Sequence, residues 1–177
     1  MLYIDTKDNT VNECGFYFGL EEYLIKDYRY DGDIFLLWST KPTVMIGRHQ
    51  VTNLEIDSKF VKDNDIKIVR RNSGGGAVYT DPGCLQFSFI TTKKSHKNIF
   101  ERHVKNIVDS VNELGINASF TGRNDILSDG KKFSGNAEYI YKDKMVIHGT
   151  ILFNSDFNNL IGSLTPDKSK LSSNAVS

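Results

Sequence analysis

The sequence of 177 residues is long enough for one medium-sized domain, and its 39% apolar and 25% charged residues are typical of soluble globular proteins. Basic and acidic side chains number 22 each, so no global field attracts nucleic acid or a membrane, and neither is an expected partner. The N-terminal segment has no apolar signal core, no stretch is apolar enough to span a bilayer, and two cysteines are too few for a disulfide framework, which together favour the cytoplasm.

The first predicted element is a helix from Glu13 to about Tyr28, in which apolar residues recur at a helical spacing. Beyond it, β-branched and aromatic runs between turn residues predict strands, and Asp57 marks the start of a short helix. In chain order, these elements are the strands Ile34–Trp38 and Thr43–Ile46, the helix Asp57–Asn64 and the strand Ile66–Val69.

A further strand, Leu85–Thr91, precedes the strongest helix of the sequence, Ile99–Leu114, whose apolar residues form one stripe and which Gly115 ends. The last predicted strand is Met145–Phe153, and Asp129-Gly130 and Lys142-Asp143-Lys144 are interpreted as hairpin turns. Neighbouring strands with few helices between them predict a single α+β domain, with a mixed, mainly antiparallel sheet flanked by helices.

The most informative segment is Arg70-Arg71-Asn72-Ser73-Gly74-Gly75-Gly76-Ala77-Val78-Tyr79, which joins two predicted strands. Three glycines let the backbone approach a ligand closely and adopt positive φ values. Successive N–H groups can form an anion-binding concavity, to which two arginines add charge suited to phosphate or carboxylate. No GK[ST] follows, so this is not a Walker loop. A ligand-binding loop is favoured over a flexible hairpin with solvent-facing arginines.

Three smaller features carry chemistry only in combination. Asp125 is suited to Mg²⁺, which binds one or two carboxylates together with substrate phosphates, and the lysines before the Ser134-Gly135 tight turn are suited to the same pocket. His148, which opens the strand 151–153, is either a base or a polar residue satisfied at a strand end. Cys84 is interpreted as a buried inert thiol, and Ser73 lacks the GxSxG context of a nucleophile.

Taken together and in this order, these segments closely resemble the lipoate–protein ligase family. The matching segments span nearly the whole chain: GRHQ at 47–50, RRNSGGGAVY at 70–79, GRND at 122–125, KFSGNA at 132–137, HGTILFN at 148–154 and TPDKSKL at 165–171. The resemblance implies a catalytic domain over residues 1–177 with the fold that the family shares with biotin protein ligases. It also implies that the family's small C-terminal domain is absent from this chain, and that a separate or removed C-terminal ligase domain is a partner.

The resemblance implies ATP and lipoate as substrates, with Mg²⁺. Lipoate's carboxylate attacks the α-phosphate of ATP, which gives lipoyl-adenylate and pyrophosphate. A lysine of a lipoyl-carrier domain, as in 2-oxoacid dehydrogenase acyltransferase subunits or the glycine-cleavage carrier protein, then attacks the adenylate and releases AMP.

The site residues that the resemblance implies follow from their places in the motifs. Lys132 is implied as the catalytic lysine that contacts both the lipoyl carboxylate and the α-phosphate, and Asp125 is implied near the magnesium-bound phosphates. An apolar, glycine-lined channel is expected to accept the dithiolane and its tail. The remaining residues are Arg71, Gly76, Ala77, Val78 and Tyr79 for ATP, and Arg70, Ser73, Gly74, Gly75, His148 and Gly149 for lipoate.

Three departures from the family pattern concern the shape of the substrate channel. They are Thr80-Asp81 in place of His-Asp, Gly83-Cys84 in place of Gly-Asn, and Tyr17-Phe18-Gly19 in place of Asn-Leu-Ala before Leu20-Glu21-Glu22. The main alternative function is an ATP-independent octanoyl or lipoyl acyltransferase of the same fold, but such enzymes tend to have GGR at the glycine block, and some use a cysteine nucleophile. The non-enzymatic alternative is a lipoyl-binding module that is inactive without its C-terminal domain.

Overall fold

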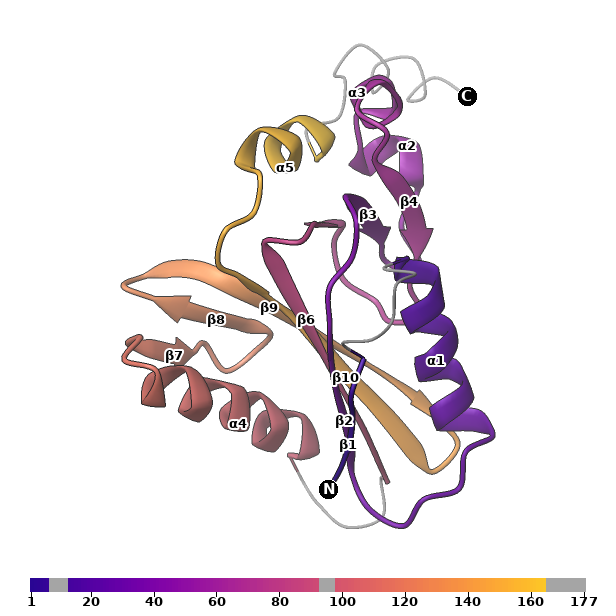
Figure 1. The fold of residues 1–177 in the computed structure, drawn as a ribbon, viewed down its shortest axis with the longest axis vertical. Helices are drawn as coiled ribbons and strands as arrows, with labels where there is room; N and C mark the ends of the chain where they lie inside the picture. Colours follow the sequence, from indigo (N-terminus) through magenta and orange to yellow (C-terminus); the bar gives the residue numbers. More distant parts are fainter. Residues whose placement is uncertain (7–12, 93–97, 165–177) are drawn as a thin grey trace.

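The computed structural model describes residues 1–6, 13–92 and 98–164, and it contains one large and one small β-sheet with helices packed around them (Figure 1). The described helices are α1 (Cys14–Lys26), α2 (Thr52–Glu55), α3 (Ser58–Asp63), α4 (Ile99–Glu113) and α5 (Phe157–Ser163). Within the described residues, no helix combines the length and the apolar character that crossing a membrane requires.

The large sheet has seven strands in the order β1-β2-β6-β10-β9-β8-β7, and the small sheet has three in the order β4-β3-β5. The pairs β1–β2 and β3–β4 are parallel and the other pairs are antiparallel, which confirms a mixed, mainly antiparallel arrangement. The strands are β1 (Leu2–Ile4), β2 (Ile34–Trp38), β3 (Thr43–Ile46), β4 (Lys67–Arg70), β5 (Val78–Thr80), β6 (Cys84–Thr92), β7 (Ala118–Phe120), β8 (Asp125–Ser128), β9 (Lys131–Tyr141) and β10 (Lys144–Leu152).

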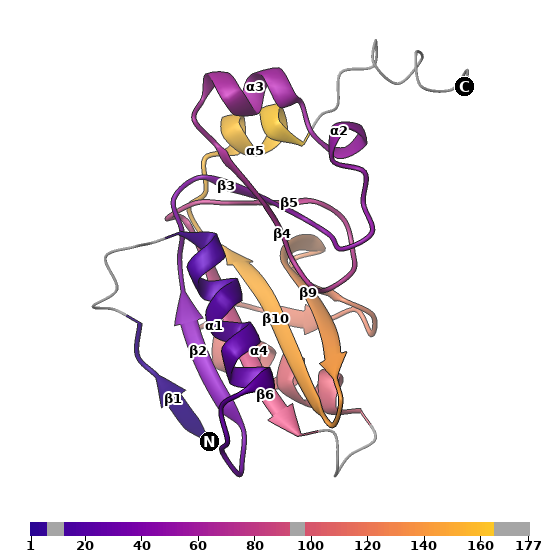
Figure 2. The same cartoon turned by 90° about the vertical axis from the view of Figure 1, so that its right-hand side faces the viewer.

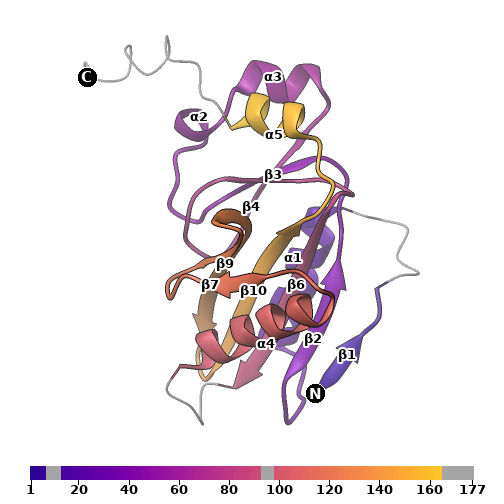
Figure 3. The ribbon, with the colours of Figure 1, turned by 90° about the vertical axis from the view of Figure 1, so that its left-hand side faces the viewer.

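Helices α1 and α4 cover opposite faces of the large sheet (Figures 2 and 3). Side chains alternate between the faces of a strand, and this alternation divides the core into two apolar clusters. On β10, Val146 packs in the cluster that contains α1, whereas Met145 and Ile147 pack in the cluster that contains α4. The α1 face of the large sheet is the face that carries the functional site described below.

A third apolar cluster joins the small sheet to α3 and α5 and includes Tyr79 of β5. Asp57 caps α3, because its Oδ1 accepts hydrogen bonds from the N–H groups of Lys59 and Phe60, both at 2.9 Å. Helix α5 packs closely on α3 at Gly162, where an added Cβ would lie 2.3 Å from Cζ of Phe60. The small sheet and these two helices therefore form one unit at the end of the large sheet.

The main predicted elements are confirmed, with shifts of one or two residues at their ends. At the turn Asp129-Gly130 both residues have positive φ values, 50° and 75°, as a tight hairpin requires. The tight turn expected at Ser134-Gly135 is wrong, because both residues lie inside β9. His148 likewise lies in the middle of β10 and does not open a strand at 151. Helices α2 and α5 were not predicted, and the segment 165–171 lies outside the described residues.

Candidate functional site

A cavity of about 140 Å³ lies between α1, the large sheet and the loop that joins β4 to β5. Apolar side chains from all three parts of the fold form much of its wall: Phe18, Trp38, Met45, Ala77 and Val78. The other lining residues are Arg71, Gly75, Gly76, Gln86, Asn124, Lys132, Gly135, Asn136, Ala137, His148, Gly149 and Thr150. An apolar enclosure with a few polar groups is the usual form of a site for a small organic ligand.

The glycine-rich loop between β4 and β5 packs against the loop that follows β3. An added Cβ on Gly47 would lie 2.1 Å from the carbonyl oxygen of Gly75, and the Arg48 N–H donates to the carbonyl of Ser73 at 2.9 Å. Gly75 has a φ of +96°, which side chains rarely allow. The two motifs GRHQ and RRNSGGGAVY are therefore parts of one double loop.

Two arginines hold this double loop together through backbone carbonyls. Arg71 is buried and donates through Nη1 to the carbonyl of Met45 at 3.0 Å, and through Nη2 to those of Gly74 at 2.9 Å and Gly76 at 2.7 Å. Arg70 donates to the carbonyl of Gly47 at 2.7 Å. The alternative of two solvent-facing arginines is therefore wrong for Arg71. Burial lowers the pKa of the Arg71 guanidinium.

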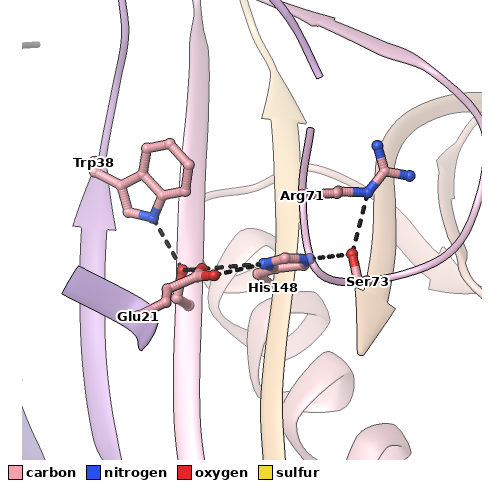
Figure 4. Close-up of polar contacts among 6 residues, drawn as sticks. Glu21, Trp38, Arg71, Ser73 and His148 are labelled. Atoms are coloured by element: carbon pink, nitrogen blue, oxygen red, sulfur yellow. Dashed lines mark hydrogen bonds and ion pairs between the residues drawn. The ribbon is translucent and has the colours of Figure 1, made fainter. Parts of the chain in front are cut away.

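A row of buried polar side chains, which includes the lining residues His148 and Arg71, connects α1, β10 and the glycine-rich loop (Figure 4). His148 Nδ1 lies 3.0 Å from Oε1 of Glu21, and His148 Nε2 lies 2.7 Å from Oγ of Ser73. Arg71 Nε donates to the same Oγ at 3.1 Å. Both ring nitrogens of His148 therefore have hydrogen-bond partners, as the interpretation of a satisfied polar residue proposed. The residue lies inside a strand, however, and it also lines the cavity.

Lys132 brings a positive charge to the mouth of the cavity. Its Nζ lies 2.8 Å from Oδ1 of Asp125, and its side chain is 53% exposed, so it remains open to a ligand. Gly135 lies beside this lysine, because an added Cβ there would be in van der Waals contact with Cε and Nζ of Lys132 at 3.4 Å. Lys131 does not line the cavity, since neighbouring residues on a strand face opposite sides.

The possible metal ligands near Lys132 fit a magnesium ion only together with a phosphate group. Among the described residues, no group of three or more His, Cys, Asp or Glu side chains gathers as a metal site. Asp125 supplies one carboxylate, which already pairs with Lys132. Because Mg²⁺ binds through one or two protein carboxylates plus substrate phosphates, Asp125 fits this ion together with phosphate oxygens.

Neither cysteine has the setting of a nucleophile. Both are free and buried, and neither belongs to the residues that line the cavity. Burial raises the pKa of the Cys84 thiol to about 11 and raises that of Cys14 further. The interpretation of Cys84 as a buried inert thiol is consistent with this environment.

The structure brings together most, but not all, of the residues that the sequence motifs indicated. Those that line the cavity are Arg71, Gly75, Gly76, Ala77, Val78, Lys132, His148 and Gly149. Ser73 and Asp125 contact the lining residues His148 and Lys132, and Gly74 lines an adjoining cavity of about 450 Å³. Arg70 holds the neighbouring loop, and the Tyr79 side chain packs in the third cluster, away from the cavity.

Several lining residues were not identified from the sequence. Asn124, Asn136 and Thr150 lie inside the motifs GRND, KFSGNA and HGT, so the motifs themselves were a signal for them. Trp38 and Met45 carried no signal beyond their strands, because core residues and cavity-lining residues look alike in sequence. Glu21, which contacts the lining residue His148, had only its place in Leu20-Glu21-Glu22.

Residues 13–177 match the family model of the lipoyl protein ligase A/B catalytic domain. The chain is 37% identical over 177 residues to lipoate-protein ligase LplJ of Bacillus subtilis, which covers 99% of this chain and 53% of that protein. The chain thus spans about half the length of the curated relatives it matches.

Solved structures of the same kind share its fold. P. falciparum LipL1 in complex with lipoate has a TM-score of 0.81 and 32% identity, over 89% of this chain and 50% of that one. A lipoate-protein ligase A bound with ATP has a TM-score of 0.77 and 27% identity, over 87% of this chain and 68% of that one.

Proposed function

This chain belongs to the lipoyl protein ligase A/B catalytic domain family, and from that premise we propose that it activates lipoate with ATP and transfers the lipoyl group to protein lysines. The observation that carries the proposal is the cavity that combines an apolar wall with Lys132 and the glycine-rich loop. The apolar wall suits an apolar tail, and the lysine and the loop suit carboxylate and phosphate groups.

In this proposal, the lipoyl tail lies in the cavity against Phe18, Trp38 and Met45. Gly149 lets β10 pack tightly beside the cavity, because an added Cβ would lie 2.5 Å from Cζ of Phe87 and 2.4 Å from Oδ1 of Asn136. Burial of an apolar tail contributes about 0.8 kcal/mol for each CH₂ removed from water. The carboxylate is thereby held at the mouth, beside Lys132.

Adenylation joins a lipoate carboxylate oxygen to the α-phosphorus of ATP, while the bond from that phosphorus to the β-phosphate oxygen breaks and pyrophosphate leaves. Negative charge concentrates where the carboxylate and the α-phosphate meet, and the Lys132 ammonium stabilises it there. Arg71 fixes the carbonyls of Gly74 and Gly76, and the N–H groups of the same trans peptides, on Gly75 and Ala77, point the opposite way. The loop therefore offers oriented N–H donors for phosphate.

Magnesium, held by Asp125 and phosphate oxygens, would neutralise part of the phosphate charge when bound. Asp125 also keeps Lys132 in place before substrates arrive, because the two side chains form an ion pair at 2.8 Å.

Transfer then requires an amine nucleophile from a second protein. The ε-amino group of a carrier-domain lysine attacks the acyl carbon of lipoyl-adenylate, an amide bond forms, and AMP leaves with the electron pair of the broken anhydride bond. Lipoyl-carrier domains such as those of 2-oxoacid dehydrogenases are the proposed acceptors. An acyltransferase that uses a cysteine nucleophile is not favoured, since both cysteines are buried away from the cavity.

The test is lipoate-dependent exchange of labelled pyrophosphate into ATP by this chain, followed by lipoylation of a carrier domain. Exchange that requires both lipoate and Mg²⁺ is expected. Transfer of an octanoyl group from a carrier without ATP, in the absence of any exchange, would instead show that the chain is an acyltransferase.

A further inference from the structure

One chain of buried hydrogen bonds connects α1, β10 and the glycine-rich loop, although these parts lie far apart in the sequence (Figure 4). Its members are Glu21, His148, Ser73 and Arg71, which are at most 6% exposed. Glu21 also accepts a hydrogen bond from the Ser88 hydroxyl at 2.6 Å, and Trp38 Nε1 donates to that hydroxyl at 2.9 Å. This chain of hydrogen bonds thus ends in the carboxylate of Glu21 on one side and in the guanidinium of Arg71 on the other.

With Glu21 ionised and the His148 ring neutral, the donors and acceptors of this chain of hydrogen bonds have one consistent direction. An ionised Glu21 carboxylate would only accept, so the proton of a neutral His148 ring would lie on Nδ1, which faces Glu21. Such a neutral ring would accept at Nε2 from the hydroxyl of Ser73, whose Oγ lies 2.7 Å away. Ser73 Oγ is left to accept from Arg71 Nε, a group that only donates. Each link depends on the one before it, beginning at Glu21.

The far end of the chain determines the shape of the cavity wall. With Nε held by Ser73, the guanidinium of Arg71 is oriented so that Nη2 reaches the carbonyls of Gly74 and Gly76. Gly75, between them, has a φ of +96° and lines the cavity. A buried guanidinium and a buried carboxylate each lose hydration and need hydrogen-bond partners in its place. This chain of hydrogen bonds links the two groups through a histidine ring and a serine hydroxyl.

We propose that Glu21 is a positioning residue of the acyl-binding site. It fixes the Nδ1–H tautomer of His148 and, through Ser73 and Arg71, holds the glycine-rich loop in the conformation that lines the cavity. The contacts of Ser73, His148 and Glu21 resemble those of a hydrolytic triad. Ser73 is not among the cavity-lining residues, however, and its Oγ accepts from Arg71, so positioning fits its environment better than nucleophilic attack.

The next residue of the same helix supplies a matched control. Glu22 carries the same functional group, but its side chain is 47% exposed and it pairs with Lys26 one turn later. A change of Glu22 to Gln therefore alters the charge of α1 and leaves the buried hydrogen bonds of Glu21 in place.

The first test reads the proton position directly, by ¹⁵N NMR of the histidine rings in the wild-type chain, with His148 assigned through His148→Gln. The expected signal at neutral pH is a neutral ring protonated at Nδ1. A ring protonated at Nε2, or at both nitrogens, would overturn the proposal. This measurement is independent of what the protein binds.

The second test measures lipoate binding by calorimetry, and only this test rests on the proposed function. Glu21→Gln is expected to weaken binding about 10- to 100-fold, as the loss of a hydrogen bond to a charged group does, while Glu22→Gln binds like wild type. Unchanged binding by a folded Glu21→Gln would refute the positioning role. If wild type itself binds no lipoate, the proposed function fails and the NMR result still stands.

A third variant keeps the proposal testable if Glu21→Gln does not fold. Ser73→Ala removes the hydroxyl that links His148 to Arg71. It should weaken lipoate binding by the same factor of about 10 to 100, while His148 keeps its proton on Nδ1. Wild-type binding by Ser73→Ala would show that the loop does not depend on this chain.

Discussion

Lys131 and Lys132 are neighbours in β9, yet only Lys132 lines the cavity. Lys132→Ala is expected to lower the rate of lipoate-dependent pyrophosphate release about 10²–10³-fold, by analogy with the loss of one oxyanion donor. Lys132→Arg should not restore the rate, because a planar guanidinium cannot replace a compact charge at a crowded junction. Lys131→Ala should be nearly silent, because its side chain faces away from the cavity.

The comparison of the two alanine variants decides the assignment of the lysines. A silent Lys132→Ala beside a strongly impaired Lys131→Ala would mean that the register of β9 is wrong. Equal and small losses in both variants would mean that neither ammonium takes part in the chemistry.

Gly75 and Gly74 are also neighbours with different demands on the backbone. Gly75→Val places a β-branched side chain at a φ of +96°, with its Cβ 3.0 Å from Nη2 of Arg71. We expect this variant to lose lipoate binding in calorimetry while its far-UV circular dichroism stays near that of wild type. Gly74→Ala is the control, since an added Cβ there meets nothing within 4 Å. Normal binding by Gly75→Val would contradict the close-packing argument.

At the scale of elements, α1 shows how a helix can be predicted while its buried face is not. The apolar residues whose spacing predicted the helix include Phe16 and Tyr23, which are 45% and 52% exposed. The buried face instead contains Tyr17, Phe18 and Glu21. Because α1 has apolar residues on most of its sides, its packing partners and the buried carboxylate select the face.

Glycine-to-alanine changes in α1 and in α5 are expected to change the free energy of unfolding in opposite directions, because α5 packs closely on α3. Gly19→Ala, on the exposed side of α1, should raise the free energy of unfolding by up to about 1 kcal/mol, because alanine favours a helix. Gly162→Ala in α5 should instead lower it by about 1–3 kcal/mol, because its Cβ would lie 2.3 Å from the Phe60 ring. Urea denaturation measures both values. Stabilisation by both variants would disprove close packing at Gly162.

At the scale of the whole molecule, His103 couples the stability of the fold to pH. It lies on α4, is 1% exposed, and stacks on Phe89 of β6 with ring centroids 4.4 Å apart. Burial lowers the pKa of His103 below the ordinary histidine value of 6.5, against the opposing effect of Asp33. The unfolded chain therefore takes up this proton at a higher pH than the folded chain does. The resulting stabilisation is complete above about pH 6.5 and is lost as the pH falls from there towards the folded-state pKa.

His103→Gln should remove this part of the acid destabilisation, because glutamine does not titrate. The free energy of unfolding, measured by denaturant titration at a series of pH values, should fall less steeply below neutral pH than in wild type. The same slope in wild type and His103→Gln would show that this ring carries no linked proton.

The sequence by itself determined the local features of this protein. Strands such as Ile34–Trp38, the N-cap at Asp57 and the turn at Asp129-Gly130 depend on residues a few positions apart, and the structure has them where they were predicted. The ordered motifs likewise indicated the family, which the family model confirms. Local conformation and motif order need no knowledge of distant contacts, so sequence was sufficient for both.

Only the tertiary structure decided how these pieces serve one site. It divided the strands between two sheets, turned Arg71 into the loop, and placed Ser134 and Gly135 inside a strand. It also distinguished Glu21 from Glu22, because Glu21 pairs with His148, 127 residues away in the chain. Buried polar groups must find hydrogen-bond partners wherever the fold places them, and nothing in the neighbouring residues specifies that place.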